Sequence, residues 1–246
     1  MIGIVGGVGP LAGLDIFKKI IEETIATKDQ EHIPVILSSQ PHRIADRTAF
    51  LLGHSTENPA QALLEIITEL DKAGAKVAAI PCNTAHASLI FNQIKEEASS
   101  LSLKLLHLVE ETAKFIQENY PNQKVGVLST TGTRDTSLYK NVLAQFGIEN
   151  IAPDDELQNS VHQAIYNEEY GIKAFSSPVT QKAQDDLIHA VSILKNQGAQ
   201  IIVLACTELP LALTEKSHLG LPTVDPNRIL ARALIQQVAP QKLKQL

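Results

Sequence analysis

Two stretches of the chain share one pattern, AGAKVAAIPCNTAHASLI at residues 73–90 and QGAQIIVLACTELPLALT at residues 197–214. In each, a helix is expected to end at a glycine, a short apolar strand follows, and a cysteine lies at the carboxyl end of that strand. The cysteines are Cys82 and Cys206. Strands that are apolar without alternation are typically buried on both faces of a parallel sheet. The paired stretches therefore predict two similar α/β lobes, each with one cysteine.

The segments around these stretches continue the alternation of strand and helix. Apolar runs rich in Val and Ile predict three more strands, at residues 2–5, 34–37 and 125–128. Apolar side chains at helical spacing predict helices over residues 11–24 and 60–73. Strands that alternate with helices build parallel sheets, so the fold class is α/β. GIVGGVGP (3–10) has a looser counterpart in GVLSTTGT (126–133), which favours a duplication, with convergent strand–turn–helix patterns as the alternative.

The composition excludes several classes of protein. The chain has 246 residues, which fits one large or two small domains, and 44 % hydrophobic with 20 % charged residues indicates a folded core. A net charge of −6 without a run of Lys or Arg argues against nucleic-acid binding. No apolar stretch approaches the roughly 20 residues that cross a bilayer, and the start MIGIVGG lacks the basic segment of a secretory signal. We therefore expect a cytoplasmic protein without a membrane partner and with two free thiols.

A glycine-rich turn follows the first predicted strand. GVGPLA at residues 7–12 fits the G-x-G-x-x-A fingerprint of dinucleotide-binding proteins. That fingerprint needs an acidic residue at the end of the second strand, which here reads LSSQ at residues 37–40, and Pro10 removes one N–H donor. NAD and FAD are therefore disfavoured. A tight turn packed on a helix, or a turn whose N–H groups face a small anion, both remain open.

The two cysteines are the strongest chemical signal in the sequence. Both are expected at the carboxyl edge of a parallel sheet, where open α/β folds bind ligands. A single such cysteine is most often a small buried apolar residue, but two in equivalent places favour a shared chemistry. No CxxC supports a disulfide, and no second Cys or His cluster joins Cys82 and His86 in a metal site. Proton transfer fits best, because one thiolate can remove a proton from carbon while a thiol delivers one to the opposite face.

Several other residues are candidates for secondary roles. His86 is expected on a helix surface or behind the site, supporting it. Arg47 follows the second predicted strand and offers a planar fork for a carboxylate, and TTGT at residues 130–133 offers hydroxyl and N–H groups. Lys173 lies in the second lobe. On chemistry alone these assignments stay open, because an arginine next to Asp46 is usually half of a local surface pair and a lone lysine is usually solvated.

Taken together, the motifs resemble the aspartate/glutamate racemase family, and within it the aspartate racemase branch. The matching segments are GIVGGVGP (3–10), DRTAFLLG (46–53), IPCNTAH (80–86), STTGT (129–133), YGIKA (170–174) and ACTELPL (205–211). The resemblance implies two similar parallel-sheet α/β domains related by a pseudo-two-fold axis, with the active site in the cleft between them. It also implies racemization of a small acidic amino acid without cofactor or metal, and a homodimer.

The resemblance further implies roles for individual residues. Cys82 and Cys206 fall on the two catalytic thiol positions. The positions that hold the substrate's α-carboxylate and amino group correspond to Asn83, Thr84, Thr131, Thr133 and Thr207. Arg47 and Lys173 fall on positions that meet the side-chain carboxylate in aspartate racemases. The sequence departs from the family pattern at Val8, at residues 41–45 and at Phe175, which leaves aspartate versus glutamate open.

Two alternative functions remain at this point. One is another enzyme of the same superfamily, namely a hydantoin racemase, a maleate isomerase or a malonate decarboxylase; the decarboxylase needs only one of the two cysteines. The other is a non-catalytic protein that binds a dicarboxylate. For the domains, we expect residues 1–104 with 215–246 to form the first lobe and residues 105–214 the second. A strand at 221–224 and a helix at 227–238 should complete the first lobe.

Overall fold

Short apolar strands build two separate sheets in the computed structural model, which describes all 246 residues. The sheets belong to two units of the chain. Unit 1 comprises residues 1–111 and 227–246, and unit 2 comprises residues 112–226. The chain leaves unit 1 within α5 (Leu108–Asn119) and returns at the start of α11 (Pro226–Val238). Both crossings therefore lie later in the chain than expected: residues 105–111 belong to unit 1 and residues 215–226 to unit 2.

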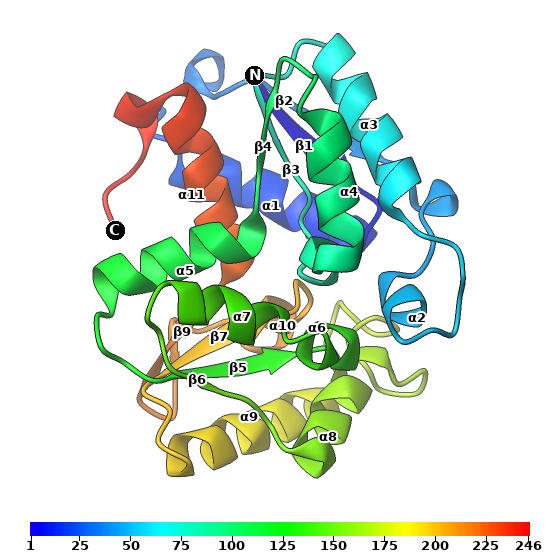
Figure 1. Cartoon of the computed structure of the whole chain (residues 1–246). Coiled ribbons are helices and arrows are strands. Elements are labelled where there is room, and N and C mark those ends of the chain that lie inside the picture. Colours follow the sequence, from blue (N-terminus) through cyan, green and yellow to red (C-terminus); the bar gives the residue numbers. More distant parts are fainter. The chain divides into compact units, whose positions relative to one another are not determined.

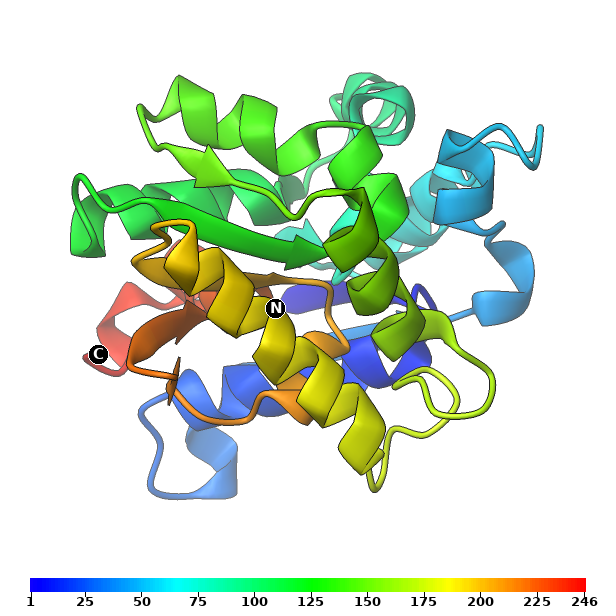
Figure 2. The same cartoon turned by 90° about the horizontal axis from the view of Figure 1, so that it is seen from below.

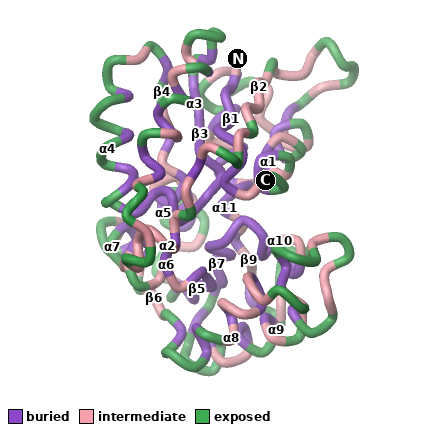
Figure 3. The backbone as a smooth tube through the Cα atoms, turned by 90° about the vertical axis from the view of Figure 1, so that its right-hand side faces the viewer, coloured by how far each residue is buried: buried purple, intermediate pink, exposed green.

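The sheet of unit 1 has four parallel strands in the order β2-β1-β3-β4. These strands are β1 (Ile2–Gly6), β2 (Val35–Ser39), β3 (Val77–Ala79) and β4 (Lys104–Leu106). The first three confirm sequence predictions, whereas β4 was not expected. β1 and β3 are fully buried, but β2 is half-buried, contrary to the expectation for its apolar run, because it lies at the edge of the sheet (Figure 3).

Helices cover both faces of this sheet. α1 (Pro10–Glu23) and α11 lie on one face, and α3 (Ala60–Lys72) and α4 (Ser88–Ala98) lie on the other (Figure 1). α1 begins with proline, whose fixed φ suits the first helical turn. Between β2 and α3 the chain forms the short helix α2 (Arg47–Leu51). The core of unit 1 consists of apolar side chains from β1, β3, α3 and α4, and Cys82 packs among them.

The sheet of unit 2 has five strands in the order β6-β5-β7-β9-β8, and only β8 is antiparallel to its neighbour. The strands are β5 (Val125–Ser129), β6 (Asn150–Ile151), β7 (Ile201–Ala205), β8 (Ser217–His218) and β9 (Leu221–Val224). α8 (Asp155–Tyr166) and α9 (Gln181–Asn196) lie side by side on one face of this sheet (Figure 2). The shorter helices are α6 (Thr131–Asp135), α7 (Leu138–Gln145) and α10 (Leu209–Ala212).

The strand expected at residues 221–224 forms, but its assignment to the first lobe is wrong. As β9 it pairs with β7 in unit 2, with Ile202 opposite Thr223 and Val203 opposite Val224. The reason is that β5 pairs with only one edge of β7. The backbone N–H and C=O groups along the other edge of β7 need hydrogen-bond partners, and β9 supplies them as a parallel strand.

The two stretches that predicted paired lobes have the same local structure. Gly74 and Gly198 follow α3 and α9 with φ of +93° and +99°, which only glycine adopts without strain. The strands that follow, β3 and β7, each pair in parallel with the first strand of their unit, β1 or β5. Cys82 and Cys206 come at the carboxyl ends of β3 and β7. Nowhere in the chain is there a helix long and apolar enough to pass through a membrane.

Candidate functional site

Cys82 lies in a tight turn that follows β3. Its backbone N–H donates to the carbonyl of Ile80 at 2.8 Å, and the residues after it form the single 3-10 turn Thr84–His86. The turn brings Cys82, Asn83 and Thr84 together, and all three are buried, with exposed fractions of 6 %, 3 % and 6 %. Three of the residues predicted for the site therefore lie in one short segment of unit 1.

His86 supports this turn from behind. Its Nδ1 lies 2.8 Å from the carbonyl oxygen of Cys82, so the ring N–H donates to that carbonyl. The His86 ring stacks on Phe91 and meets the edge of His107, with ring centroids 4.8 and 4.6 Å away. Burial, with a smaller contribution from His107, holds the pKa of His86 well below its usual value. A neutral, buried His86 thus fixes the Cys82 backbone. The expected position on a helix surface is therefore wrong, and the expected position behind the site is the one observed.

The glycine turn before α1 lies at the same edge of the sheet as Cys82. Gly7 has a φ of +89°, and a Cβ at this position would come within 2.8 Å of the backbone nitrogen of Pro41. Two segments of backbone therefore approach so closely that no other residue fits at position 7. This favours the reading of GVGPLA as a tight packed turn.

Arg47 is the first residue of α2 and is half-buried. Its neighbour Asp46 caps that helix, because the carboxylate accepts the backbone N–H of Ala49 at 2.7 Å. The Arg47 Nη1 donates to the carbonyl of Ala45 at 3.3 Å. Neighbouring Asp and Arg residues commonly form a local surface pair. Here Asp46 caps α2 instead, and the Arg47 guanidinium contacts the Ala45 carbonyl.

In unit 2, Cys206 begins the loop between β7 and α10 and is 6 % exposed. Its Sγ donates to Oε2 of Glu208 at 3.0 Å, and the hydroxyl of Thr207 donates to the same oxygen at 3.2 Å. Burial raises the pKa of the Cys206 thiol well above its usual value, and the charge of Glu208 raises it further; Lys173 opposes both. Cys206 is therefore a thiol at neutral pH.

Lys173 forms an ion pair with Glu208, with Nζ 2.6 Å from Oε1. Burial lowers the pKa of Lys173, but the charge and hydrogen bond of Glu208, together with smaller contributions from Cys206 and Tyr166, raise it overall. In turn, burial raises the pKa of Glu208, and the ammonium of Lys173 together with hydrogen bonds lowers it overall. Both groups are therefore charged. The Nζ of Lys173 also lies 5.2 Å from the ring centroid of Tyr166, a cation–π contact.

The threonine turn follows β5 and starts α6. Thr130 caps this helix, and its Oγ1 accepts the backbone N–H of Thr133 at 3.3 Å. Thr133 is 1 % exposed and Thr131 is half-buried. Because Ser129 pairs with Ala205 across β5 and β7, the threonine turn and Cys206 leave neighbouring strands at the same edge of the sheet. The residues predicted for unit 2 are thus brought to one place.

Polar side chains on one face of α8 support the threonine turn. Gln158 donates from Nε2 to the carbonyl of Ser129 at 2.8 Å, and Nδ1 of His162 accepts the N–H of Thr131 at 3.4 Å. One turn further on, Tyr166 stacks on His162 with ring centroids 4.8 Å apart.

The sequence interpretation missed two features: the row of Gln158, His162 and Tyr166 along α8, and the role of Glu208. The row could have been found from its spacing of four residues, which places side chains on one face of a helix. Glu208 could have been found as a carboxylate two residues after Cys206. No group of three or more His, Cys, Asp or Glu side chains is arranged to hold a metal ion.

Comparisons with known proteins identify the family of this chain. The model of the Asp/Glu/hydantoin racemase family matches residues 5–234. The chain is 30 % identical over 240 residues to the broad-specificity amino-acid racemase RacX of Bacillus subtilis, covering 96 % of each protein. It is 25 % identical over 190 residues to the glutamate racemase of Fusobacterium nucleatum, covering 76 % of this chain and 67 % of that one. The aspartate racemase of Picrophilus torridus has a similar structure, with a TM-score of 0.80 and 27 % identity over 99 % of this chain and 95 % of that one. The chain belongs to the Asp/Glu/hydantoin racemase family.

Proposed function

We propose that the protein is a cofactor-independent amino-acid racemase that interconverts L- and D-aspartate, and glutamate as a related substrate. The observation that carries this proposal is the pair of buried thiols, one after β3 and one after β7, each at the carboxyl edge of its own sheet. Membership of a racemase family supports the reaction class. The aspartate racemase among the similar structures supports the choice of substrate.

The chemistry requires one base and one acid on opposite faces of Cα. One cysteine, as thiolate, removes the α-proton, and the other, as thiol, delivers a proton to the opposite face of the planar carbanion. The roles of Cys82 and Cys206 exchange for the other enantiomer. No redox step and no covalent bond to the enzyme is needed, since both thiols act only as proton carriers.

In this proposal the polar residues near the thiols hold the substrate. The α-carboxylate and amino group are held by Asn83, Thr84, Thr131, Thr133 and Thr207. The side-chain carboxylate meets Arg47 and Lys173, whose cationic groups suit a carboxylate. Lys173 is already paired with Glu208, so a substrate carboxylate has to share that ammonium. The planar guanidinium of Arg47 can bind a carboxylate through two parallel hydrogen bonds, so Arg47 is expected to contribute more of the selectivity for dicarboxylates than Lys173 does.

The Lys173–Glu208 pair also favours a second candidate, racemization over a broader range of amino acids. An ammonium balanced by a carboxylate at 2.6 Å attracts a substrate carboxylate less strongly than an isolated one would. An uncharged side chain is penalised less in such a site. The similar protein RacX is named for its broad specificity, which fits this alternative.

One experiment tests the reaction and separates these candidates. The protein is incubated in deuterated water with each enantiomer of aspartate, glutamate and alanine, and exchange and inversion at Cα are followed by proton NMR and chiral chromatography. We expect inversion of aspartate, with deuterium in the product. Equal rates for alanine would select the broader specificity, and binding of aspartate without exchange would show a binding protein.

The same assay tests the two thiols. Cys82→Ser and Cys206→Ser should each reduce racemization of aspartate by about 10²-fold or more, because a serine hydroxyl is a poor acid or base at neutral pH. Circular dichroism checks that both variants are folded. Near-normal turnover of both enantiomers by Cys82→Ser would contradict the two-thiol mechanism. A covalent adduct of Cys82 or Cys206 with the substrate, detected by mass spectrometry, would indicate an isomerase that uses cysteine as a nucleophile.

A further inference from the structure

Glu208 lies between Cys206 and Lys173 and contacts both. It directly precedes α10 but does not cap that helix with its side chain. The carboxylate instead turns back along the loop, where Oε2 accepts from Cys206 and Thr207 and Oε1 accepts from Lys173. This return of the side chain brings one charged carboxylate against the thiol.

The surroundings keep this carboxylate ionised. Glu208 is 7 % exposed, and a buried carboxylate is costly unless it is paired and hydrogen-bonded. Lys173 supplies the opposite charge at 2.6 Å, and two further donors satisfy the remaining oxygen. An ionised carboxylate can only accept hydrogen bonds. The proton in its contact with Cys206 must therefore reside on sulfur.

Other ionisable groups near Cys206 do not reverse this conclusion. Tyr139 of α7 interacts electrostatically with Cys206 and Asp225, and burial raises the pKa of its phenol, so Tyr139 is uncharged at neutral pH. Tyr166 of α8 lies against Lys173 in a cation–π contact. Lys173 is the one cation among these groups, and its ammonium lies on the far oxygen of Glu208 rather than on Sγ. The nearest charge to the thiol is thus negative.

We propose that Glu208 is a positioning residue that keeps Cys206 in the thiol form and directs its S–H bond, so that in the free enzyme Cys206 is the proton donor of the reaction. This deepens the proposed racemization and rests on it, and it leaves the part of the base to Cys82. During turnover the S–H bond breaks, a C–H bond forms at Cα, and the electron pair of the S–H bond stays on sulfur. Glu208 and Lys173 keep their charges throughout.

The same charge acts in both directions of the reaction. A negative group beside sulfur disfavours the thiolate, so the resting thiol does not lose its proton to water at neutral pH. Once Cys206 has donated its proton, the thiolate lies beside that carboxylate and takes a proton back more readily. Lys173 keeps the cost of this step moderate, because its ammonium balances one of the two negative charges.

The test measures the ionisation of Cys206 directly. In a Cys82→Ser background Cys206 is the only thiol, and its rate of alkylation by iodoacetamide is recorded against pH. Glu208→Gln keeps the size of the side chain but removes the charge, so we expect the midpoint of the alkylation profile to move to lower pH by about 1–3 units. Glu215→Gln, which removes an exposed carboxylate of the same unit, is the matched control and should leave the midpoint unchanged.

Racemization gives the second readout. With both cysteines present, Glu208→Gln should lower kcat/KM for aspartate about 10- to 100-fold at neutral pH. The same variant should make the Cys206 thiol more reactive toward iodoacetamide. A purely structural role of Glu208 would not lower racemization while raising thiol reactivity. Glu208→Asp retains the charge and should recover part of the activity. If Glu208→Gln does not fold, Glu208→Asp should still shift the alkylation midpoint slightly in the same direction, since its shorter side chain withdraws from sulfur.

The outcomes separate this inference from the proposed function. An unchanged alkylation midpoint in folded Glu208→Gln overturns the role of Glu208, whatever the protein racemizes. A shifted midpoint in a protein that exchanges no α-proton supports control of the thiol by Glu208 and overturns the racemase proposal. A shifted midpoint together with loss of racemization supports both.

Discussion

The two cations proposed to meet the substrate side chain have different surroundings. Lys173 donates to the buried carboxylate of Glu208, and Arg47 donates to the carbonyl of Ala45. A guanidinium also binds a carboxylate through two parallel hydrogen bonds, which an ammonium cannot do. At the scale of single residues, selectivity for a dicarboxylate should therefore depend mainly on Arg47.

Replacing Arg47 by glutamine tests this dependence. Losing a charged hydrogen-bond donor costs about 1.5–3 kcal/mol, so kcat/KM for aspartate should fall about 10- to 100-fold, while activity on alanine changes little. Arg43→Gln is the matched control, because Arg43 is paired with Glu65 and Glu69 and has no assigned place in the site. Equal losses on aspartate and alanine would refute the assignment of Arg47 to the side-chain carboxylate.

Single residues also show where prediction from sequence ends. The positions of Cys82 and Cys206 were predictable, because a cysteine that follows a buried strand has to lie at the carboxyl edge of the sheet. The pairing of Lys173 with Glu208 was not, because the two residues are 35 positions apart in separate loops. Which way a loop side chain turns depends on its three-dimensional neighbours, and no periodicity records them.

At the scale of elements, the strongly apolar strands were predicted, whereas the short strands β4 and β6 were not. β1, β5 and β7 each have five residues that are all buried, so their sequence alone identifies them. β6 has two residues and β4 three, and they form because an adjacent strand offers hydrogen-bond partners. The sequence of β9 predicted a strand but not its neighbour. A pairing partner is set by topology, which local patterns do not contain.

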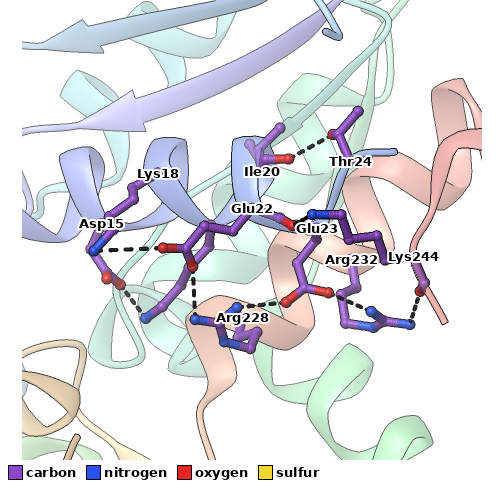
Figure 4. A network of polar contacts seen from close by, with 10 residues as sticks. Asp15, Lys18, Ile20, Glu22, Glu23, Thr24, Arg228, Arg232 and Lys244 are labelled. Carbon is purple, nitrogen blue, oxygen red and sulfur yellow. Dashed lines mark hydrogen bonds and ion pairs between the residues drawn. The ribbon is translucent and has the colours of Figure 1, made fainter. Parts of the chain in front are cut away.

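A network of ion pairs connects α1 to α11 within unit 1 (Figure 4). Glu23 of α1 accepts from Arg228 and from Arg232, both at 2.5 Å, and Arg228 also donates to Glu22 at 2.9 Å. Near the middle of α1, Asn227 donates to Asp15 at 2.9 Å. These contacts fix α11 on α1 directly after the chain has returned from unit 2.

This network should make the stability of the protein depend on pH. Burial raises the pKa of Glu23, but the hydrogen bonds and the positive charges of Arg228 and Arg232 together outweigh burial and hold the pKa below the ordinary value of 4.5. The unfolded chain then binds this proton more tightly than the folded protein, so the contribution is complete above pH 4.5 and is lost as pH falls through the lowered pKa.

Glu23→Gln is the variant that tests the network. It should destabilise the protein by about 1–3 kcal/mol at pH 7 and by less at pH 3, as measured by urea unfolding at both pH values. The exposed Glu96 of α4 provides the control, since Glu96→Gln removes the same charge without an ion pair and should have little effect. A loss of stability that is the same at both pH values would show that packing, and not the ion pairs, is responsible.

At the scale of the whole molecule, the two units differ in how the chain builds them. Unit 2 is one continuous segment, whereas unit 1 is assembled from two segments that are separated by all of unit 2. The second segment contributes α11 and the contact between Thr24 and Leu243, an isolated bridge. Unit 1 therefore depends on residues that are distant in sequence, and unit 2 does not.

The difference predicts how fragments behave when the chain is cut at the starts of α5 and α11. Residues 108–225 should fold alone and unfold cooperatively in urea, because all five strands of their sheet and the helices on it are present.

Residues 1–107 should remain largely unfolded, because α1 lacks the helix that covers it and Glu23 lacks its two arginine partners. Joining residues 226–246 to residues 1–107 through a flexible linker should restore a cooperative transition, followed by circular dichroism, and the same linker with a scrambled 226–246 sequence should not. If residues 1–107 fold without α11, the second segment is an addition to unit 1 and not part of its core.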